Sequence, residues 1–370
     1  MPQKYCSAID TGLFVDVNGA VKLCCSGSVS LGNIRQQSIN EVFQTVEFYK
    51  LKENLYNNKT DSYCSGCDSI EKTAPGSSQR SAFNEQFKNT DGRKLGLIDI
   101  RWSNVCNLSC RYCNVEDSSE WRKLHNLPVS TVNKDYTESL FKEIEENKNS
   151  IENIYLLGGE PLLQKHNIRL LSTINPSVKI DLLTNLSVKL DNNSIYKELK
   201  KFNMVLWNLS FDNIGDRFEY VRAGAEWVQF ESNLERICDD FGAHRVTFHP
   251  VYTIWNSTCL EEYYEYADKK KLRVNWQVAL PKVDNYGLAT DSFVVFGHKP
   301  KVIERAIREI EKLSVNDSAL EGIKNSLVNS IEQPNKSKEF LDWTVKMEQF
   351  MPPRKTFDVL WPELNTLLSQ

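Results

Sequence analysis

The sequence predicts an α/β fold: a partial, six-stranded (β/α)6 barrel, with a small cysteine-rich α+β module before it and a mainly helical region after it. Three observations support this expectation. Strand-like apolar runs alternate with helix-period segments from residue 95 onward, five cysteines lie among short β-like pieces in residues 1–67, and the last 80 residues are mostly helical in pattern. Alternating strands and helices are typical of a parallel sheet with helical crossovers.

Residues 1–69 are expected to form the cysteine-rich module. The stretch "GLFVDVNGAVKLCC" alternates like a β-hairpin, with Asn18 and Gly19 as a two-residue turn. Apolar residues then recur at helical spacing, which predicts one short amphipathic helix. These residues are Ile39, Val42, Phe43, Val46 and Leu51. Residues 70–94 are polar and contain Pro-Gly-Ser-Ser, which indicates a connector.

Residues 95–281 are expected to form the barrel. The six strand-like runs are "LGLIDIRW", "IENIYLLGG", "VKIDLLT", "VLWNLSFD", "HRVTFHPVY" and "LRVNWQVAL". A complete eight-stranded barrel usually takes about 250 residues, which is more than this span offers. The clearest helix, "EWVQFESNLERICDDFG", has one apolar face and should stop at Gly242. Residues 282–370 form the helical extension, with amphipathic stretches such as "KVIERAIREIEKL".

Composition limits the class of protein. Apolar residues make up 41% and charged residues 25% of the chain, and no apolar run approaches the roughly 18 to 20 residues of a membrane helix. The start, "MPQKYCSAID", lacks the apolar core of a signal peptide, so a cytoplasmic protein without membrane attachment is expected. Ten cysteines in a reducing compartment then indicate metal or redox chemistry. The formal charge of −4 gives no basic footprint, which makes a nucleic-acid partner unlikely.

The stretch "NVCNLSCRYCNV" supplies three cysteines, Cys106, Cys110 and Cys113, just after the first predicted barrel strand. Active sites of α/β barrels lie at that end of the strands. A closed zinc site needs a fourth cysteine or histidine nearby, and the nearest histidine, His125, is twelve residues further on. A [4Fe–4S] cluster takes one thiolate per iron, so three thiolates leave one iron open to another ligand.

The C-x3-C-x2-C spacing, with Tyr112 just before the last cysteine, resembles the signature of radical S-adenosylmethionine (radical SAM) enzymes. The resemblance implies a radical SAM barrel in which S-adenosylmethionine chelates the open iron and is reductively cleaved to a 5′-deoxyadenosyl radical. One strand later, "IYLLGGEPLL" places Gly158, Gly159 and Glu160 at a position similar to the family element that receives the methionyl amine. Glycines allow close backbone approach to a ligand, and a carboxylate can accept from an ammonium group.

Later strand ends carry polar residues at positions similar to those around the cofactor in this family. They are Asn185, Ser210, Asp212 and Arg222, with Asn256 and the backbone near Val278 as further candidates. A carboxylate can bind ribose hydroxyls and an arginine the cofactor carboxylate. Each residue taken alone is more typical of a cap or a solvated position than of a cofactor site.

The first five cysteines resemble the SPASM/twitch module, which carries auxiliary [4Fe–4S] clusters in some radical SAM enzymes. The pattern is C-x12-G-x4-C followed by C-x2-C, and the resemblance implies one auxiliary cluster. Its ligands would be Cys6, Cys24, Cys64 and Cys67, with Cys25 as the alternative to Cys24. A structural zinc site is the other interpretation of these cysteines. The module usually follows the barrel, whereas here it precedes it, and the full seven-cysteine pattern is missing.

The resemblance implies a radical SAM enzyme of the oxidoreductase, epimerase or peptide-modifying type, which abstracts hydrogen from a substrate C–H bond. Its cofactors would be two [4Fe–4S] clusters and S-adenosylmethionine, and its partners a peptide or a small polar metabolite and an electron donor such as flavodoxin or ferredoxin. Cys238 is expected in the core, and Cys259 is a possible hydrogen donor to a substrate radical. The alternative is a non-catalytic, zinc-stabilised binding scaffold.

Overall fold

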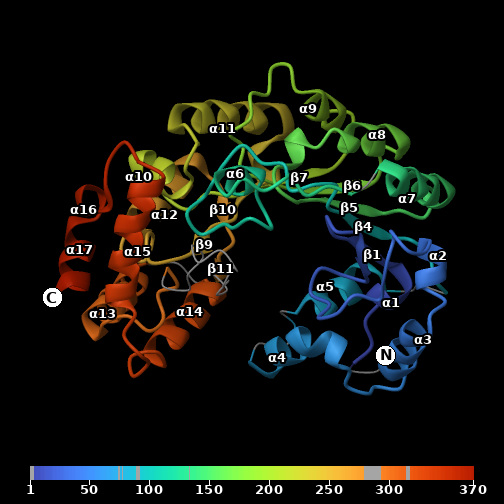
Figure 1. The fold of residues 1–370 in the computed structure, drawn as a ribbon, viewed down its shortest axis with the longest axis horizontal. Coiled ribbons are helices and arrows are strands. Elements are labelled where there is room, and N and C mark those ends of the chain that lie inside the picture. The colour runs from blue at the N-terminus through green and yellow to red at the C-terminus, as the bar shows by residue number, and fades with distance from the viewer. Residues whose placement is uncertain are drawn as a thin grey trace. The chain divides into compact units, whose positions relative to one another are not determined.

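The protein is described here by a computed structural model that covers residues 4–73, 76, 78–88, 92–132, 134–278, 293–313 and 317–370. The chain divides into two compact units, and each combines segments distant in sequence. The first unit comprises Met1–Val105, Val129–Leu182 and Asn193–Leu206, and the second comprises Cys106–Pro128, Leu183–Asn192 and Trp207–Gln370. Figure 1 labels their helices and strands.

The first unit is built on strands from both the cysteine-rich module and the barrel. They are β1 (Gly12–Val15), β2 (Ala20–Lys22), β3 (Gly32–Asn33), β4 (Leu97–Ile100), β5 (Asn153–Leu156) and the larger part of β6 (Lys179–Thr184). Strands β1, β2 and β3 pair antiparallel, β4, β5 and β6 pair parallel, and β1 pairs parallel with β4. Figure 1 labels β1, β4, β5 and β6 next to one another. The cysteine-rich module therefore extends the barrel sheet instead of forming a separate sheet.

The second unit holds the remaining strands. They are most of β7 (Val205–Leu209), β8 (Val246–Phe248), β9 (Val251–Tyr252), β10 (Arg273–Val274) and β11 (Gln277–Val278). Strand β8 pairs parallel with β7 and β10, and β9 pairs parallel with β11 in a second small sheet. The strand order is β6-β5-β4-β1-β2-β3 in the first unit and β10-β8-β7 in the second, which confirms the predicted α/β fold with mostly parallel strands.

Helices alternate with these strands. In the first unit they are α1 (Ala8–Thr11), α2 (Ile39–Val42), α3 (Val46–Tyr56), η1 (Ser62–Cys64), α4 (Ser65–Thr73), α5 (Gln79–Gln86), α7 (Lys134–Asn147), η2 (Pro161–Leu163), α8 (His166–Thr173) and α9 (Ser194–Leu199). In the second they are α6 (Ser119–Leu124), α10 (Gly215–Val221), α11 (Trp227–Phe241), η3 (Ala243–Arg245), α12 (Leu260–Lys270), α13 (Pro300–Lys312), α14 (Ser318–Val328), α15 (Ser337–Phe350), α16 (Phe357–Leu360) and α17 (Pro362–Ser369). The predicted helix that ends at Gly242 is α11, and the last five confirm the helical C-terminus.

The predicted two-residue turn at Asn18 and Gly19 is wrong. The strands are joined by a three-residue loop, because Asp16 pairs with Ala20 through a 3.1 Å backbone hydrogen bond. The Asp16 carboxylate accepts hydrogen bonds from the backbone N–H groups of Asn18 and Ala20, at 2.8 and 2.9 Å. Gly19 takes the left-handed conformation, with φ +81°, that such loops require.

The single amphipathic helix predicted for Ile39–Leu51 is also wrong, because two helices occur there. Ser38 caps α2 with a capping box, and the Thr45 hydroxyl accepts from the Phe48 N–H to start α3. Val46 is 78% exposed, so it does not belong to the buried face that the pattern suggested.

Three further segments differ from the expectation. The predicted connector contains α5, and the fifth and sixth strand-like runs are each divided into two short strands. The end of the sixth run, residues 279 and 280, lies outside the described residues. Among the described residues, no helix combines the length and apolar character that crossing a bilayer requires.

Candidate cofactor and cluster sites

The loop that carries the three cysteines is held by α6 on one side. Ser119, at the start of α6, accepts a hydrogen bond from the Cys106 N–H at 3.0 Å and donates one to the Cys106 carbonyl at 3.1 Å. The Trp121 indole N–H donates to the Cys110 carbonyl at 2.9 Å. Two of the three cysteine positions are thus fixed by side chains of one helix.

The segment after α10 holds the same loop from the other side. The Ser109 N–H donates to the Ala223 carbonyl at 2.9 Å, and the Arg111 N–H donates to the Val221 carbonyl at 2.8 Å. These two bonds flank Cys110, which is 8% exposed. The backbone on both sides of the middle cysteine is therefore held in place by the segment after α10.

Two predicted cofactor residues point at the sulfur atoms. Asn185 Nδ2 lies 3.7 Å from Cys106 Sγ, and Arg222 Nη1 lies 3.8 Å from Cys110 Sγ. Burial raises the pKa of the Cys110 thiol, and the positive charge of Arg222 opposes that rise. Because thiolates are the metal-binding form, both donors favour the state in which this loop binds a metal cluster.

Tyr112, Asp212 and Arg222 form one buried polar group beside the loop. The Tyr112 hydroxyl donates to Asp212 Oδ2 at 2.8 Å, and Arg222 Nη2 lies 2.8 Å from the same oxygen. Burial alone would lower the pKa of Arg222, but the Asp212 carboxylate outweighs it and raises that pKa. The pair is therefore charged, and removal of either partner would leave a buried charge without compensation.

An aromatic core fixes the position of Asp212. The preceding residue, Phe211, is fully buried and its ring lies 4.5 Å from that of Phe248 and 5.1 Å from that of Phe230. The other carboxylate oxygen of Asp212 accepts from the Val251 N–H at 2.9 Å. Asp212 thus has both oxygens oriented by protein groups, which is the arrangement of a preorganised site.

Asn185 is held by a strained loop that the sequence did not reveal. Leu186 has φ +54°, which is unusual for a residue other than glycine, asparagine or aspartate. The buried Asn233 of α11 donates to the carbonyls of Leu186 and Val188, at 2.8 and 2.9 Å. The sequence signal that could have identified Asn233 was its polar side chain on the otherwise apolar face of the predicted helix. Strain of this kind persists where surrounding contacts fix the backbone.

The glycines of the GGE element pack on the residues just before the triplet, within the first unit. A Cβ atom on Gly159 would lie 2.2 Å from the Val105 carbonyl oxygen and 2.6 Å from that of Asn104. Gly158 has φ +124°, and its Cβ would lie 2.5 Å from Gln164 Nε2. Both positions thus require glycine, one for close approach and the other for its backbone conformation.

Glu160 is fully buried at the start of η2. Its N–H donates to the Val105 carbonyl at 2.7 Å, and its Oε1 accepts from the Leu162 N–H at 3.0 Å. Gln164, 2% exposed, has an Oε1 atom without a hydrogen-bond partner among the described residues. The element therefore combines closely packed glycines with a buried acceptor, Gln164 Oε1, for which the described part of the chain supplies no donor.

Four cysteines of the N-terminal module line one cavity: Cys6, Cys24, Cys64 and Cys67. Apolar side chains of Leu23, Leu55 and Phe83 complete much of its wall. Burial raises the pKa of the Cys6 thiol, and the charges of the other three thiolates add to this rise. Burial also raises the pKa of Cys24, to about 12. Among the described residues, no three His, Cys, Asp or Glu side chains meet closely enough to hold a single metal ion.

Arg80, in the segment predicted as a connector, is the cation of this cavity. Its side chain is 3% exposed, and it pairs with Asp68 at 2.8 Å and with Glu71 at 2.5 Å. Burial raises the pKa of Cys64, and a hydrogen bond from Arg80 opposes that rise. The Ser78 N-cap of α5, followed by Phe83 on its buried face, was the sequence signal that could have identified this helix.

Cys25 and Cys24 lie in different surroundings. Cys25 is exposed and does not line the four-cysteine cavity. Although the residue as a whole is exposed, desolvation of its sulfur atom by nearby protein atoms raises the pKa of the thiol; the charge of Asp99 adds to this rise and that of Arg101, also in the β4 region, opposes it. The structure therefore groups Cys24, and not its neighbour, with the other three thiols.

Of the remaining predicted residues, Asn256 contacts Asp212, because its Nδ2 lies 3.5 Å from the Asp212 carbonyl oxygen. The others lie outside these contacts. The Ser210 N–H donates to the Thr184 carbonyl at 2.9 Å, and Asn256 braces its own turn by bonding the Val251 carbonyl at 2.8 Å. Val278 is 44% exposed in β11. Cys259 lines a surface cavity with Arg217 and Trp361, among other residues. Cys238, predicted to be core, is only partly buried.

Comparison with known proteins identifies two regions. Residues 100–267 match the family model of the radical SAM superfamily, and residues 6–68 match that of the SPASM iron–sulfur cluster-binding domain. A 7-carboxy-7-deazaguanine synthase of Clostridium acetobutylicum is 30% identical over 120 residues, which cover 31% of this chain and 50% of the relative. A GTP 3′,8-cyclase of Clostridium perfringens is 28% identical over 139 residues, covering 36% and 40%. The chain thus spans half or less of the length of these relatives.

Two solved structures are similar at low sequence identity. Native anSMEcpe with bound AdoMet and Cp18Cys peptide has a TM-score of 0.42 and 18% identity, covering 68% of this chain and 65% of its own. Streptococcus suis SuiB bound to the precursor peptide SuiA has a TM-score of 0.42 and 16% identity, covering 74% and 59%. From the two family matches and the cysteine loop that they include, the chain belongs to the radical SAM superfamily and carries a SPASM iron–sulfur domain at its N-terminus.

Proposed function

We propose that this chain is an active radical SAM enzyme in which Cys106, Cys110 and Cys113 hold a [4Fe–4S] cluster that binds S-adenosylmethionine. The observation that carries the proposal is the loop itself: three thiols within eight residues, with donors from Asn185 and Arg222 aimed at two of the sulfur atoms. Three thiolates suit a cluster that keeps one iron for the cofactor. When bound, the cofactor supplies the 5′-deoxyadenosyl radical that removes hydrogen from an unactivated C–H bond.

Each unit contributes residues that we propose to bind the cofactor's polar groups. Gly158 and Gly159 let the GGE element pack directly against the backbone that leads into the cysteine loop, and Gln164 offers a buried acceptor. Asp212 and Arg222 form the charged pair that orients Tyr112. We assign Glu160 and Asn185 to cofactor binding as well, on their place at the ends of β5 and β6. The role of this chain's residues is to hold and orient the cofactor and to exclude water.

The four-cysteine cavity is proposed to hold one auxiliary [4Fe–4S] cluster. Four thiols in one cavity, with apolar walls and one buried arginine, provide one thiolate per iron and a positive charge for an anionic cluster. The separate surroundings of Cys25 favour Cys24 as the ligand.

A polar row across the first unit's sheet supports a polar substrate that bears charged groups. The strand register places Asp99, Tyr155 and Asp181 side by side on β4, β5 and β6. Arg101 pairs with Asp99 through two hydrogen bonds, at 2.5 and 2.9 Å, and Lys179 lies 2.9 Å from Asp181. Mainly because of burial, the pKa of Tyr155 is raised to about 12, so its hydroxyl remains a donor at neutral pH.

The opposite face of the same strands is closed. Ile98, Ile154 and Ile180 are each at most 1% exposed, so that face is packed core. Tyr155 and Asp181 in this row are half-buried and Asp99 is buried beside Arg101. Charged and hydroxyl groups of this kind suit either a peptide segment or an amino-bearing metabolite. The pairs can exchange their internal partners for those of a substrate without leaving a buried charge unpaired.

Anaerobic reconstitution tests the function. We expect about eight irons per chain and 5′-deoxyadenosine after addition of dithionite and S-adenosylmethionine. The Cys106/Cys110/Cys113→Ala variant should retain about four irons and form no 5′-deoxyadenosine. Zinc in place of iron, with no cleavage of the cofactor, would instead support a metal-stabilised scaffold and end the enzyme proposal.

A further inference from the structure

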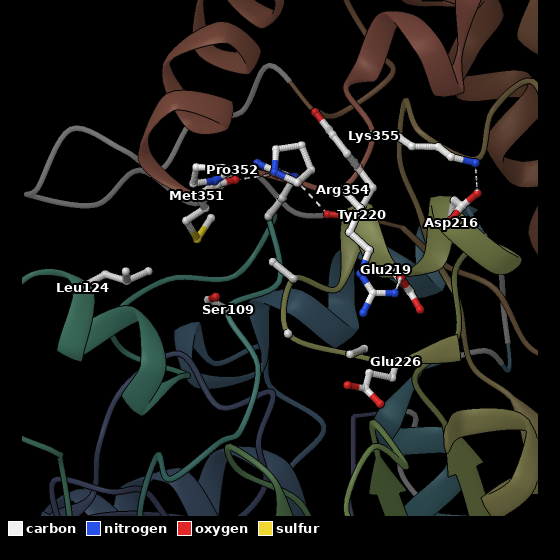
Figure 2. Close-up of a pocket in the computed structure, with 15 residues that line it drawn as sticks. Ser109, Leu124, Asp216, Glu219, Tyr220, Glu226, Met351, Pro352, Arg354 and Lys355 are labelled. Atoms are coloured by element: carbon white, nitrogen blue, oxygen red, sulfur yellow. Dashed lines mark hydrogen bonds and ion pairs between the residues drawn. The ribbon is translucent and has the colours of Figure 1, made fainter. Parts of the chain in front are cut away.

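The two cavities beside the proposed cluster ligands differ in what their walls leave unpaired. The cavity of about 360 Å³ that borders the cysteine loop in the second unit has as many carboxylates as cations in its wall (Figure 2). Its rim cations are paired, Arg354 with Glu219 and Lys355 with Asp216. The other is the four-cysteine cavity of the first unit. One residue of its wall, Tyr63, has a buried hydrogen-bond donor that no described residue accepts.

Tyr63 is fixed against the segment that carries Cys24. It lies in η1, directly before Cys64, and is 3% exposed. The Ser28 N–H donates to the Tyr63 carbonyl at 3.1 Å, and the Gly27 N–H closes a turn onto the Cys24 carbonyl at 3.2 Å. A Cβ atom on Gly27 would lie 2.4 Å from both Cζ and Oη of Tyr63. The phenol end of the ring is therefore packed directly on the turn that follows Cys24.

The hydroxyl of Tyr63 accepts one hydrogen bond, and its own hydrogen has no acceptor among the described residues. The Leu23 N–H donates to Tyr63 Oη at 2.7 Å. A tyrosine hydroxyl is a donor as well as an acceptor, and no interaction of Tyr63 with a described residue uses the donor. Because an unused buried donor costs free energy, such groups nearly always have a partner. We expect the missing acceptor in the cavity that Tyr63 lines.

Sulfur atoms are the acceptors that fit this position. Burial raises the pKa of the Tyr63 phenol, and the charges of the Cys24 and Cys64 thiolates add to the rise, so both sulfur atoms are close enough to act on it. Hydrogen bonds to the sulfur atoms are one of the factors that set the potential of an iron–sulfur cluster. Arg80, the cation of the same cavity, is already paired with Asp68 and Glu71. Tyr63 differs from it in having a donor left for the contents of the cavity.

A second tyrosine of the module provides an internal comparison. Tyr5 directly precedes Cys6, as Tyr63 directly precedes Cys64, and Tyr5 is also buried. The Tyr5 hydroxyl donates to Asp10 Oδ2 at 3.0 Å, and Tyr5 does not line the four-cysteine cavity. Each tyrosine thus lies next to a proposed ligand, but only the Tyr5 hydroxyl donates to a protein carboxylate.

We propose that the Tyr63 hydroxyl donates a hydrogen bond to a sulfur atom of the auxiliary cluster and thereby raises the reduction potential of that cluster. This inference rests on the proposed function, because it requires the [4Fe–4S] cluster assigned to the four cysteines. The reduced cluster carries one more negative charge than the oxidised cluster, so a donor to sulfur stabilises the reduced state more. The hydrogen stays on Tyr63 in both states, and no covalent bond is made or broken.

The first measurement is the potential of the auxiliary cluster alone. The Cys106/Cys110/Cys113→Ala chain, reconstituted with iron and sulfide, is titrated with dithionite and followed by electron paramagnetic resonance. We expect Tyr63→Phe to lower the equilibrium constant for one-electron reduction about tenfold, which is a shift of about 59 mV to lower potential. Tyr5→Phe is the matched control, because it also removes a buried phenol hydroxyl beside a proposed ligand. It should leave the potential close to that of the parent chain.

A spectroscopic measurement separates the hydrogen bond from a general change in structure. Electron–nuclear double resonance of the reduced cluster should detect a proton coupling that disappears in heavy water. The coupling should be missing in Tyr63→Phe and present in Tyr5→Phe. Replacement of Tyr63 by a ring-fluorinated tyrosine keeps the hydroxyl and makes it a stronger donor, so it should raise the potential above that of the parent chain. Iron content and melting temperature check the folding of each chain.

The outcomes separate the two proposals. The parent potential and proton coupling in Tyr63→Phe overturn the hydrogen bond and leave the auxiliary cluster intact. Equal shifts in Tyr63→Phe and Tyr5→Phe show a general loosening of the module and also overturn it. If Tyr63→Phe loses its iron, the fluorinated chain decides, because an unchanged potential there contradicts the proposal and a higher one supports it. A parent chain that binds zinc or no iron at the four cysteines refutes the auxiliary cluster, and the hydrogen bond with it.

Discussion

Replacement of Gly159 by alanine should disturb both the GGE element and the start of the cysteine loop. The added Cβ would lie 2.2 Å from the Val105 carbonyl oxygen, whereas real Cβ atoms essentially never come closer than 3.0 Å to such an atom. Both clashing groups are backbone, so no rotamer change relieves the contact and the two chain segments must separate. Overpacking of this kind costs about 1–3 kcal/mol. The 2.7 Å bond from the Glu160 N–H to Val105 would be strained or lost, which adds about 1 kcal/mol.

The assay combines thermal unfolding with cofactor cleavage. For a unit of this size each kcal/mol lowers the melting temperature by about 2–4 °C, so Gly159→Ala should melt several degrees lower. Val105 is bonded directly to Cys106, and a displacement near 1 Å in a reacting site can cost about 10²-fold in rate, so 5′-deoxyadenosine formation should fall by that order. Gly322→Ala is the control, because no atom lies within 4 Å of its Cβ position in α14. Wild-type melting and cleavage in Gly159→Ala would refute the packing argument.

Three further predictions concern residues around the two cluster sites. Asn233→Leu should lower the free energy of unfolding by about 1–3 kcal/mol, since two carbonyls of the loop after β6 lose their donor. The same variant should bind S-adenosylmethionine more weakly in a calorimetric titration; unchanged affinity would show that the loop keeps its conformation without Asn233. Arg80→Met should lower the reduction potential of the auxiliary cluster by roughly 60 mV in a redox titration, the equivalent of about 1.4 kcal/mol, because a buried cation is removed. Cys24→Ala should reduce the iron content from about eight to about four, whereas Cys25→Ser should keep about eight; the reverse result would exchange the two ligands.

The barrel strands were predictable because their pattern is local. Runs such as "VKIDLLT" carry enough apolar and β-branched residues to form strands in sequence order, and parallel neighbours follow from the helices between them. The triplet and the GGE element were predictable for the same reason, since both directly follow such runs. The left-handed Gly242 at the end of α11 is likewise a local signal.

The features that the sequence did not predict depend on single side chains or on contacts between residues far apart in the sequence. The Asp16 carboxylate accepts hydrogen bonds from two backbone N–H groups and so makes the loop longer than the expected two-residue turn. The alternation of apolar and polar residues cannot predict such a side-chain contact. The role of Arg80 was hidden because its segment is polar and holds Pro-Gly, although its helix places it in the four-cysteine cavity. The strain at Leu186 depends on Asn233, 47 residues away.

The position of the module before the barrel has a physical explanation in the pairing of β1 with β4. The module precedes the barrel in the sequence, whereas in the family it usually follows it. An open sheet edge needs only a neighbouring strand, and a strand can pair with the edge of β4 whether it precedes or follows β4 in the sequence. The register Phe14↔Asp99 continues the row Asp99, Tyr155, Asp181 into the module, and Arg101 lies 5.4 Å from the Phe14 ring. The two consecutive cysteines therefore lie in different surroundings: Cys24 lines the cavity of four thiols, and Cys25 lies near Asp99 and Arg101 of the polar row. A module of three short strands is too small to be stable alone, so its pairing with β4 both completes its core and brings the proposed auxiliary cluster close to the polar row.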